Sequence, residues 1–362
     1  MTVQKPLNKP LLQRAWLGRG PLARALWPLA LVFGALAALR RGLYRSGLLR
    51  TAAPLPVPVI VVGNVLAGGA GKTPLVIALV QHLQQRGWRP GVVSRGYGRQ
   101  GSDHRLLTSA STPQDVGDEP LLIAHATQAP TAVGPRRPEA ARRLLAAHPE
   151  VDVIVCDDGL QHYALARDIE VVAFDERGTG NGWLLPAGPL REHWPRRGDE
   201  IVLHTGSRPA PALAGEGFRA QRALAGYAIG AEGARQPLAD WRGASVIALA
   251  GIAKPEAFFE MLRAQGLRLA HTQALPDHAD FRAWKRPPGA DPNLPLLCTE
   301  KDAVKLWPQE RKALAVPLLF TPEPGFFAAI DQRLAAVLRG RLSSIFQHRA
   351  YPTDTTDGQQ TP

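Results

Sequence analysis

The chain has 362 residues, of which 45% are hydrophobic and 20% charged, and this composition excludes an intrinsically disordered protein. Its length permits large buried cores and predicts two domains. The formal net charge is +12. Cys156 and Cys298 each end an apolar run, which is typical of buried strand residues in a reducing compartment, and their spacing does not indicate a metal site.

The first 50 residues contain nine basic and no acidic side chains around an apolar run over residues 25–39. This pattern predicts a basic amphipathic helix that associates with a membrane surface. The run is shorter than the about 20 residues of a spanning helix, and Pro28 and Gly34 weaken it as an isolated helix.

Three other interpretations of this segment compete with membrane association. Arginines follow the apolar run where a signal peptide needs small residues at a cleavage site, which argues against export. No recognition motif accompanies the basic residues, so we expect no nucleic-acid partner. A solvated or core-packing helix stays open as an alternative.

From residue 51 onward, strands alternate with helices, which indicates an α/β fold. An expected strand over 59–62 leads into a glycine-rich loop that ends in Lys72-Thr73, followed by a helix over 73–86. This arrangement predicts a phosphate-binding loop for a nucleoside triphosphate, with Lys72 reaching the terminal phosphates and the Thr73 hydroxyl on Mg²⁺. The predicted binding residues are Gly68, Gly69, Ala70, Gly71, Lys72 and Thr73.

The loop departs from the usual pattern at one position. The first glycine, six residues before the lysine, is replaced by Leu66, so the turn must be built differently. A glycine-rich turn with an exposed lysine is the alternative interpretation.

Near-continuous apolar strands follow over 90–94, 151–156, 169–174 and 199–204, with helices over about 119–127 and 138–147. Strands of this kind are buried on both faces of a parallel sheet. Asp157 and Asp158 come directly after one of them, where such sheets place the carboxylates that hold Mg²⁺, although the pair could also form a solvated turn. By pattern alone, Asp118 and Glu119 mark the N-terminus of a helix, since Asp suits the cap and acids suit the first turn.

Residues 206–240 show no clear period and indicate a domain boundary. A second α/β pattern follows, with strands over 245–251, 267–272 and 295–299 and helices over 255–265 and 326–338. The expected division is 1–50 as the membrane-associating segment, 51–225 as the nucleotide-binding domain, 226–345 as a smaller α/β domain and 346–362 as a disordered tail. The run Thr299–Asp302 differs from a guanine-recognition motif, which argues against GTP specificity.

Taken in order, several segments resemble the tetraacyldisaccharide 4'-kinase family of lipid A biosynthesis. The similar segments are 63–74, 94–99, 116–120, 157–162, 185–192, 276–278 and 299–302, and the resemblance extends from about residue 15 to 340. The displaced glycine is shared by that family.

The resemblance implies a membrane-associated P-loop kinase with two α/β/α domains. It would transfer the γ-phosphate of ATP to the 4'-hydroxyl of an acylated glucosamine disaccharide 1-phosphate, forming lipid IVA. It also implies that Asp118 is the catalytic aspartate, paired with His278, and that Asp157 and Asp158 serve Mg²⁺, which reverses the capping interpretation of Asp118.

The implied location is the cytoplasmic face of the bacterial inner membrane, as a peripheral or monotopic protein with a glycolipid substrate and no protein partner. A membrane-attached P-loop nucleotide switch that regulates a partner protein is the alternative function, and a soluble kinase with an ordinary N-terminal helix is a further one.

Overall fold

The computed structural model describes residues 12, 15–68, 71–196, 198–205, 216–277, 279, 281 and 284–349, the side chains of 216 and 344–349 excepted. Two predicted loop residues, Gly69 and Ala70, lie outside the described residues. The predicted catalytic His278 and the tail 350–362 also lie outside them.

The first part of the chain forms a large, mostly parallel sheet, which has nine strands among the described residues. Its order is β15-β8-β7-β6-β1-β5-β2-β4-β3, with only the edge strands β3 and β15 antiparallel to their neighbours. The strands are β1 (Val59–Gly63), β2 (Pro90–Ser94), β3 (Arg105–Leu106), β4 (Thr131–Val133), β5 (Val153–Asp157), β6 (Ile169–Phe174), β7 (Ile201–His204), β8 (Glu216–Leu224) and β15 (Leu318–Pro322). The predicted parallel α/β sheet is therefore confirmed.

Helices cover both faces of this sheet, which is why its strands are apolar on both sides. Alternate residues of β1 belong to two separate hydrophobic clusters, Val59 and Val61 to one and Ile60 and Val62 to the other. The second cluster includes residues of α3 (Lys72–Gln85), α5 (Asp118–Thr127) and α9 (Pro324–Arg349), and the first includes residues of α6 (Arg137–Ala147). The short α4 (Pro113–Val116) precedes α5.

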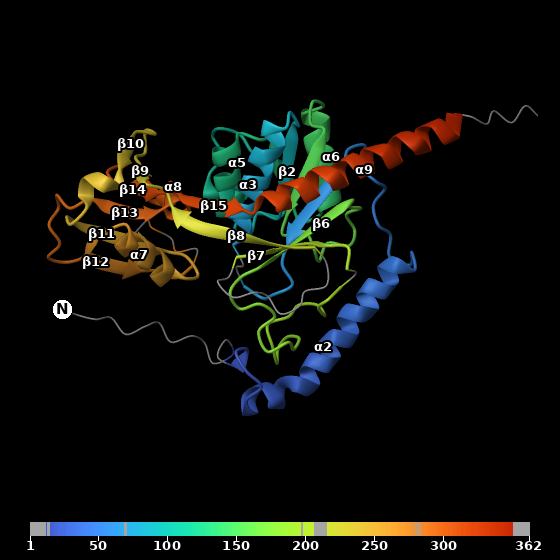
Figure 1. Ribbon diagram of the computed structural model, residues 1–362, viewed down its shortest axis with the longest axis horizontal. Coiled ribbons are helices and arrows are strands. Elements are labelled where there is room, and N and C mark those ends of the chain that lie inside the picture. The colour runs from blue at the N-terminus through green and yellow to red at the C-terminus, as the bar shows by residue number, and fades with distance from the viewer. Residues whose placement is uncertain are drawn as a thin grey trace, which may run out of the picture.

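A smaller sheet forms a second body, at the left of Figure 1. Among the described residues it has six strands in the order β10-β9-β14-β13-β11-β12. Its elements are β9 (Tyr227–Ile229), β10 (Arg235–Pro237), the 3-10 helix η1 (Leu238–Trp241), β11 (Ser245–Ala250), α7 (Pro255–Ala264), β12 (Arg268–Ala274), β13 (Leu296–Thr299), α8 (Glu300–Leu306) and β14 (Leu314–Val316). The second, smaller α/β domain is thus present.

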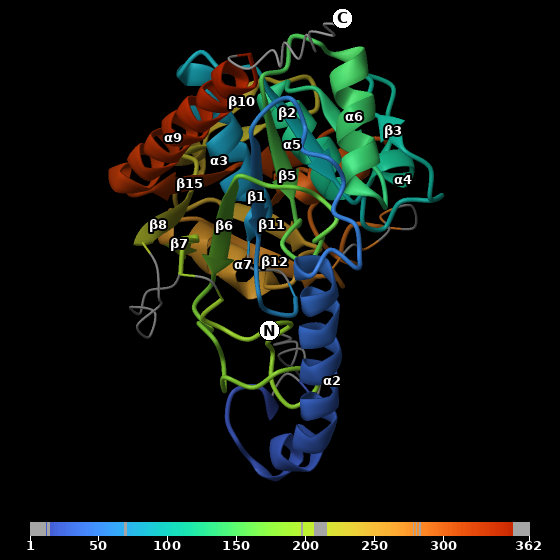
Figure 2. The same ribbon diagram turned by 90° about the vertical axis from the view of Figure 1, so that its right-hand side faces the viewer.

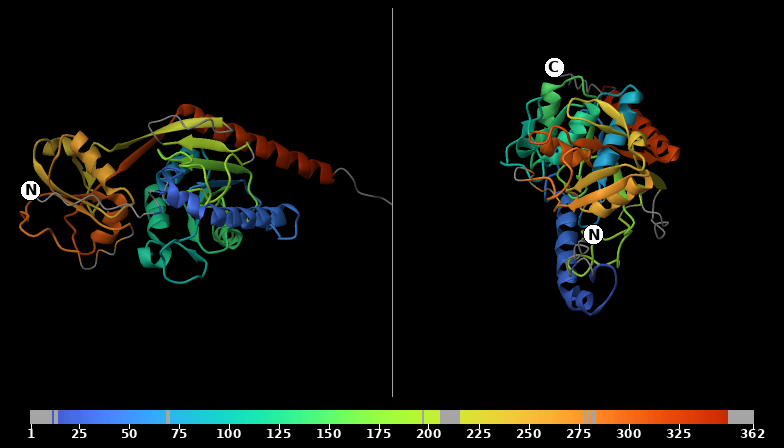
Figure 3. Two further views of the ribbon diagram at one scale, coloured as in Figure 1. Left: turned by 90° about the horizontal axis from the view of Figure 1, so that it is seen from below. Right: turned by 90° about the vertical axis from the view of Figure 1, so that its left-hand side faces the viewer.

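Two antiparallel strands, β8 and β15, join the two bodies (Figures 1 and 3). The chain leaves the large sheet through β8 and returns to it through β15 and α9, so residues 318–349 belong with the first body. We therefore propose that the second domain covers about residues 226–316, a shorter range than the expected 226–345.

The N-terminal helix α2 (Pro21–Arg45) stands apart from both sheets (Figure 2). It is continuous through Pro28 and has 25 residues, so the expectation that its apolar part is too short to span a membrane is wrong. By length and composition it is the one helix among the described residues that could cross a membrane.

One face of α2 packs on the protein through small residues, Ala23, Ala30 and Gly34, which are buried. Opposite them lies the loop 177–196, with Trp183 beside Trp27 at 6.5 Å between ring centroids. The other side of the helix exposes large apolar side chains: Leu22, Leu29, Leu31, Val32, Leu36 and Leu39.

Candidate phosphotransfer site

The phosphate loop joins the end of β1 to the start of α3. Gly71, the N-cap of α3, has φ +68° and ψ +40°, and Gly68 has φ +89°, conformations that favour glycine. Asn64 is fully buried and braces the loop, because its Nδ2 donates to the Gly68 carbonyl at 3.1 Å and its Oδ1 accepts from Lys72 Nζ at 3.2 Å. Asn64 therefore links the two ends of the loop, Gly68 and Lys72, through its side chain.

Lys72 connects this loop to the carboxylates at the end of β5. Its Nζ lies 3.4 Å from Asp158 Oδ1, and its side chain is 11% exposed, so the alternative of an exposed lysine is wrong. Asp158 has φ +49°, one of two positive values at non-glycine residues in the described chain. Such backbone strain persists where surrounding contacts enforce it, and it is common at functional sites.

Asp157 is the second carboxylate and lies buried at the end of β5. Ser94 Oγ donates to its Oδ2 at 3.1 Å, while its buried Oδ1 has no hydrogen-bond partner among the described residues. Burial, followed by the nearby Glu119 carboxylate, raises the pKa of Asp157 to about 7. A cation in contact with this oxygen would therefore favour the ionised form.

These residues fit a magnesium ion. Mg²⁺ is commonly held by one or two carboxylates together with substrate phosphates and waters, so a large cluster of protein ligands is not needed. The unpartnered Asp157 oxygen, the Asp158 carboxylate beside Lys72 and the Thr73 hydroxyl in the first turn of α3 supply oxygen donors of the right kind.

Asp118 is the first residue of α5, and Gly117 is its N-cap. The expected helix N-terminus is present, but Gly117 occupies the cap, so Asp118 lies in the first turn of α5 and is not the capping residue. Its Oδ2 instead lies 3.0 Å from Nζ of Lys305, which comes from α8 in the second domain. Asp118 therefore faces the interface between the two domains.

Gln161 and His162 follow the aspartate pair closely in the chain. Gln161 Nε2 donates to the Asn64 carbonyl at 3.2 Å and to Glu192 Oε1 at 2.7 Å. Burial, with Arg137 next in effect, lowers the pKa of His162 to about 4. His162 is thus a neutral side chain at physiological pH.

Two arginines beside the phosphate loop were not predicted from the sequence. Arg177 is oriented by Asp175, with 2.9 Å between Nε and Oδ1, and its Nη1 donates to the Ala67 carbonyl at 3.2 Å. Arg222, on β8, reaches the loop so closely that a Cβ added to Gly71 would lie 1.8 Å from its Nη2. Arg222 gave no signal in the sequence, because it lies within the stretch without a clear period.

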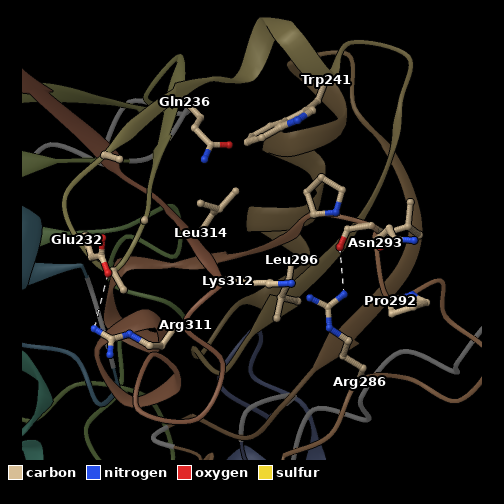
Figure 4. A pocket seen from close by; sticks show the side chains of 15 residues that line it. Glu232, Gln236, Trp241, Arg286, Pro292, Asn293, Leu296, Arg311, Lys312 and Leu314 are labelled. Carbon is tan, nitrogen blue, oxygen red and sulfur yellow. Dashed lines mark hydrogen bonds and ion pairs between the residues drawn. The ribbon is translucent and has the colours of Figure 1, made fainter.

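A cavity of about 460 Å³ lies elsewhere, on the second sheet (Figure 4). Trp241, Gln236 and Lys312 are among its lining residues. Its arginines are already paired, Arg286 with Glu310 at 3.2 Å and Arg311 with Glu232 at 3.9 Å. It shares no residue with the phosphate loop and is separate from the site above.

A phosphate loop on a parallel sheet, with a lysine directed at a strand-end carboxylate, defines a P-loop nucleotide-binding protein. A profile of the tetraacyldisaccharide-1-P 4'-kinase family matches residues 22–335. The chain therefore belongs to that family and is a kinase.

Similar proteins agree over nearly the whole chain. The tetraacyldisaccharide 4'-kinase of Acidovorax sp. (strain JS42) is 59% identical over 331 residues, which are 91% of this chain and 96% of that one. The enzyme of the same name from Polaromonas naphthalenivorans is 56% identical over 343 residues, 93% of this chain and 98% of that one. The crystal structure of LpxK from Aquifex aeolicus in complex with ATP has a TM-score of 0.76 and 25% identity, and covers 86% of this chain and 99% of that one.

Proposed function

We propose that the protein transfers the γ-phosphate of ATP to the 4'-hydroxyl of tetraacyldisaccharide 1-phosphate, which forms lipid IVA in lipid A biosynthesis. The observation that carries this proposal is the placement of Lys72, 3.4 Å from the strand-end Asp158, in a chain that the family profile matches over residues 22–335. A nucleotide switch would need the same loop but no sugar-lipid acceptor, and family membership does not favour it.

Charge neutralisation and alignment supply most of the rate in phosphoryl transfer. Lys72 binds the terminal phosphates, and backbone N–H groups of the glycine-rich loop bind them as well. Arg177 and Arg222 add positive charge beside the loop, since both approach its backbone.

Thr73, Asp157 and Asp158 would hold Mg²⁺, which when bound neutralises negative charge on the phosphates. The buried and unpartnered Asp157 oxygen supports this assignment. Asp118 accepts the proton of the acceptor hydroxyl, and His278 is its partner by resemblance to the family. The position of Asp118 at the domain interface supports an active site between the two domains.

The proposed location is the cytoplasmic face of the inner membrane, with α2 as the membrane-contacting element. The exposed apolar side chains of α2 and its basic residues, among them Arg24, Arg40 and Arg41, suit an anionic membrane surface. Because the small residues of α2 are packed on the protein, one face is available to lipid, which supports a monotopic arrangement over a free spanning helix.

The test is an assay of the purified full chain with γ-labelled ATP, Mg²⁺ and tetraacyldisaccharide 1-phosphate in detergent micelles. We expect a labelled glycolipid that comigrates with lipid IVA, and no such product from Lys72→Met. Label released as inorganic phosphate at the same rate with and without the lipid, and no labelled glycolipid, would reject the kinase and favour the switch.

A further inference from the structure

Helix α8 lies at the interface between the domains and begins with Thr299–Asp302, a motif that the proposed reaction leaves without a role. Asp302 is fully buried, and its Oδ2 accepts from the Gly251 N–H at 2.9 Å and from Thr299 Oγ1 at 2.6 Å. Thr299 in turn caps the helix by accepting from the Asp302 N–H at 3.3 Å. The start of α8 is therefore fixed to the ends of strands β11 and β13.

The Lys305 side chain of this fixed helix extends toward the first domain. Lys305 Nζ lies 3.0 Å from Asp118 Oδ2, and the two side chains are 10% and 12% exposed. The same ammonium donates to the Ala279 carbonyl at 3.1 Å and lies 5.3 Å from the centre of the Phe281 ring. One side chain thus connects the start of α5 in the first domain with a loop of the second.

A second lysine of α8 contacts the same loop one helical turn earlier. Lys301 and Lys305 are four residues apart, so they lie on one face of the helix. Lys301 Nζ donates to Asp277 Oδ1 at 2.9 Å. The lysine face of α8 therefore holds the loop at residues 277 and 279 while it contacts Asp118.

We propose that Lys305 is a positioning residue for the phosphotransfer reaction, which holds the Asp118 carboxylate in place across the domain interface. This inference rests on the proposed function, in which Asp118 accepts the proton of the acceptor hydroxyl. A largely desolvated ammonium attracts a carboxylate more strongly than a surface lysine does, so it orients the carboxylate when the second domain is in place. The role of the motif at 299–302 is then to fix the start of α8, the helix that carries Lys305.

A purely structural ion pair would make different predictions. It would affect the melting temperature but not the kcat of the folded enzyme, so Lys305→Met would then have the kcat of Lys312→Met. A positioning residue acts through Asp118, so its removal has no further effect once Asp118 is gone.

The experiment compares Lys305→Met, Asp118→Ala and the double variant in the lipid phosphorylation assay, with kcat and the KM for ATP measured at saturating lipid. Lys312→Met is the matched control, because Lys312 is an exposed lysine of the same domain and lines the separate cavity of Figure 4. We expect Lys305→Met to lower kcat at least about tenfold, up to the about 10²–10⁴-fold of the base itself, with little change in the KM for ATP. The double variant should be no slower than Asp118→Ala.

Several results would overturn the proposal: a Lys305→Met variant with the kcat of Lys312→Met, a loss confined to the KM for ATP, or multiplying losses in the double variant. If Lys305→Met alone does not fold, the double variant still decides, because removing both partners leaves no unpaired buried charge. Failure of the wild-type chain to phosphorylate the lipid would reject the proposed function, whereas an active wild type with an unaffected Lys305→Met would reject only this inference.

Discussion

Replacing Gly71 by alanine tests the geometry of the phosphate loop. Gly71 has φ +68°, and a Cβ there would lie 1.8 Å from Arg222 Nη2 and 2.7 Å from its Cζ. Two costs therefore combine in Gly71→Ala, the left-handed backbone conformation and the displacement of the Arg222 side chain.

The same helix offers a control that separates these costs. Gly87 follows the C-terminal end of α3 with φ +87°, and an added Cβ would meet nothing within 4 Å. The left-handed conformation costs a residue with a side chain roughly 1–2 kcal/mol. At about 2–4 °C per kcal/mol for a domain of this size, Gly87→Ala should lower the melting temperature by about 2–8 °C and leave activity unchanged.

At Gly71 the same 1–2 kcal/mol falls on the phosphate-binding conformation of the loop. Since about 1.4 kcal/mol is a tenfold change in affinity, the backbone term alone weakens ATP binding roughly 5- to 30-fold. The displaced Arg222 adds to this, so we expect the KM for ATP to rise at least about tenfold in Gly71→Ala.

The assay is ATP titration of lipid phosphorylation for the wild type and both alanine variants, with thermal unfolding of each. A KM for ATP in Gly71→Ala equal to that of Gly87→Ala would refute the reasoning, because the collision and the loop conformation would then have no influence on the nucleotide.

Three further predictions concern the metal, the lysine and the N-terminal helix. Lys72→Met should lower kcat/KM by about 10²–10³-fold in a protein that still folds, because the lost hydrogen bond to the buried Asn64 and the lost ion pair with Asp158 together cost about 1–3 kcal/mol of stability. A variant whose activity falls only in proportion to its unfolded fraction would contradict this. Chelation by EDTA should abolish phosphate transfer, and added Mg²⁺ should restore it. In a metal titration, Asp157→Asn should raise the Mg²⁺ concentration needed for the half-maximal rate. An unchanged Mg²⁺ concentration would contradict the assignment of Asp157 to the Mg²⁺ site. Leu36→Glu, on the exposed face of α2, should reduce cosedimentation with anionic vesicles. Gly34→Leu should lower the melting temperature and leave vesicle binding unchanged, because its Cβ would lie 2.7 Å from a side-chain carbon of the loop opposite. The reverse pattern would contradict the assignment of the two faces.

The sequence by itself determined the large sheet and the centre of the candidate site. Strands buried on both faces are apolar at every position, so β1, β5 and β6 were evident as continuous runs. Glycines before Lys72 and aspartates after a buried strand are local patterns, and the parallel sheet brings their ends together at one edge, with 3.4 Å between Lys72 and Asp158.

The helix α2 shows where local pattern was insufficient. Pro28 and Gly34 weaken an isolated helix, yet the helix is continuous over 25 residues. Gly34 is buried close to the loop 177–196, so a residue unfavourable to an isolated helix permits the close packing that stabilises this one.

Only the tertiary structure decided which charged residues surround the site. The strand β8 was not predicted, because it lies in a stretch of the sequence without a clear period, and therefore Arg222 was not placed beside Gly71. Lys305 and Asp118 are 187 positions apart and belong to different domains. No local pattern encodes such a contact, since it depends on how α5 and α8 are held by their separate sheets and on the paired strands that join the two domains.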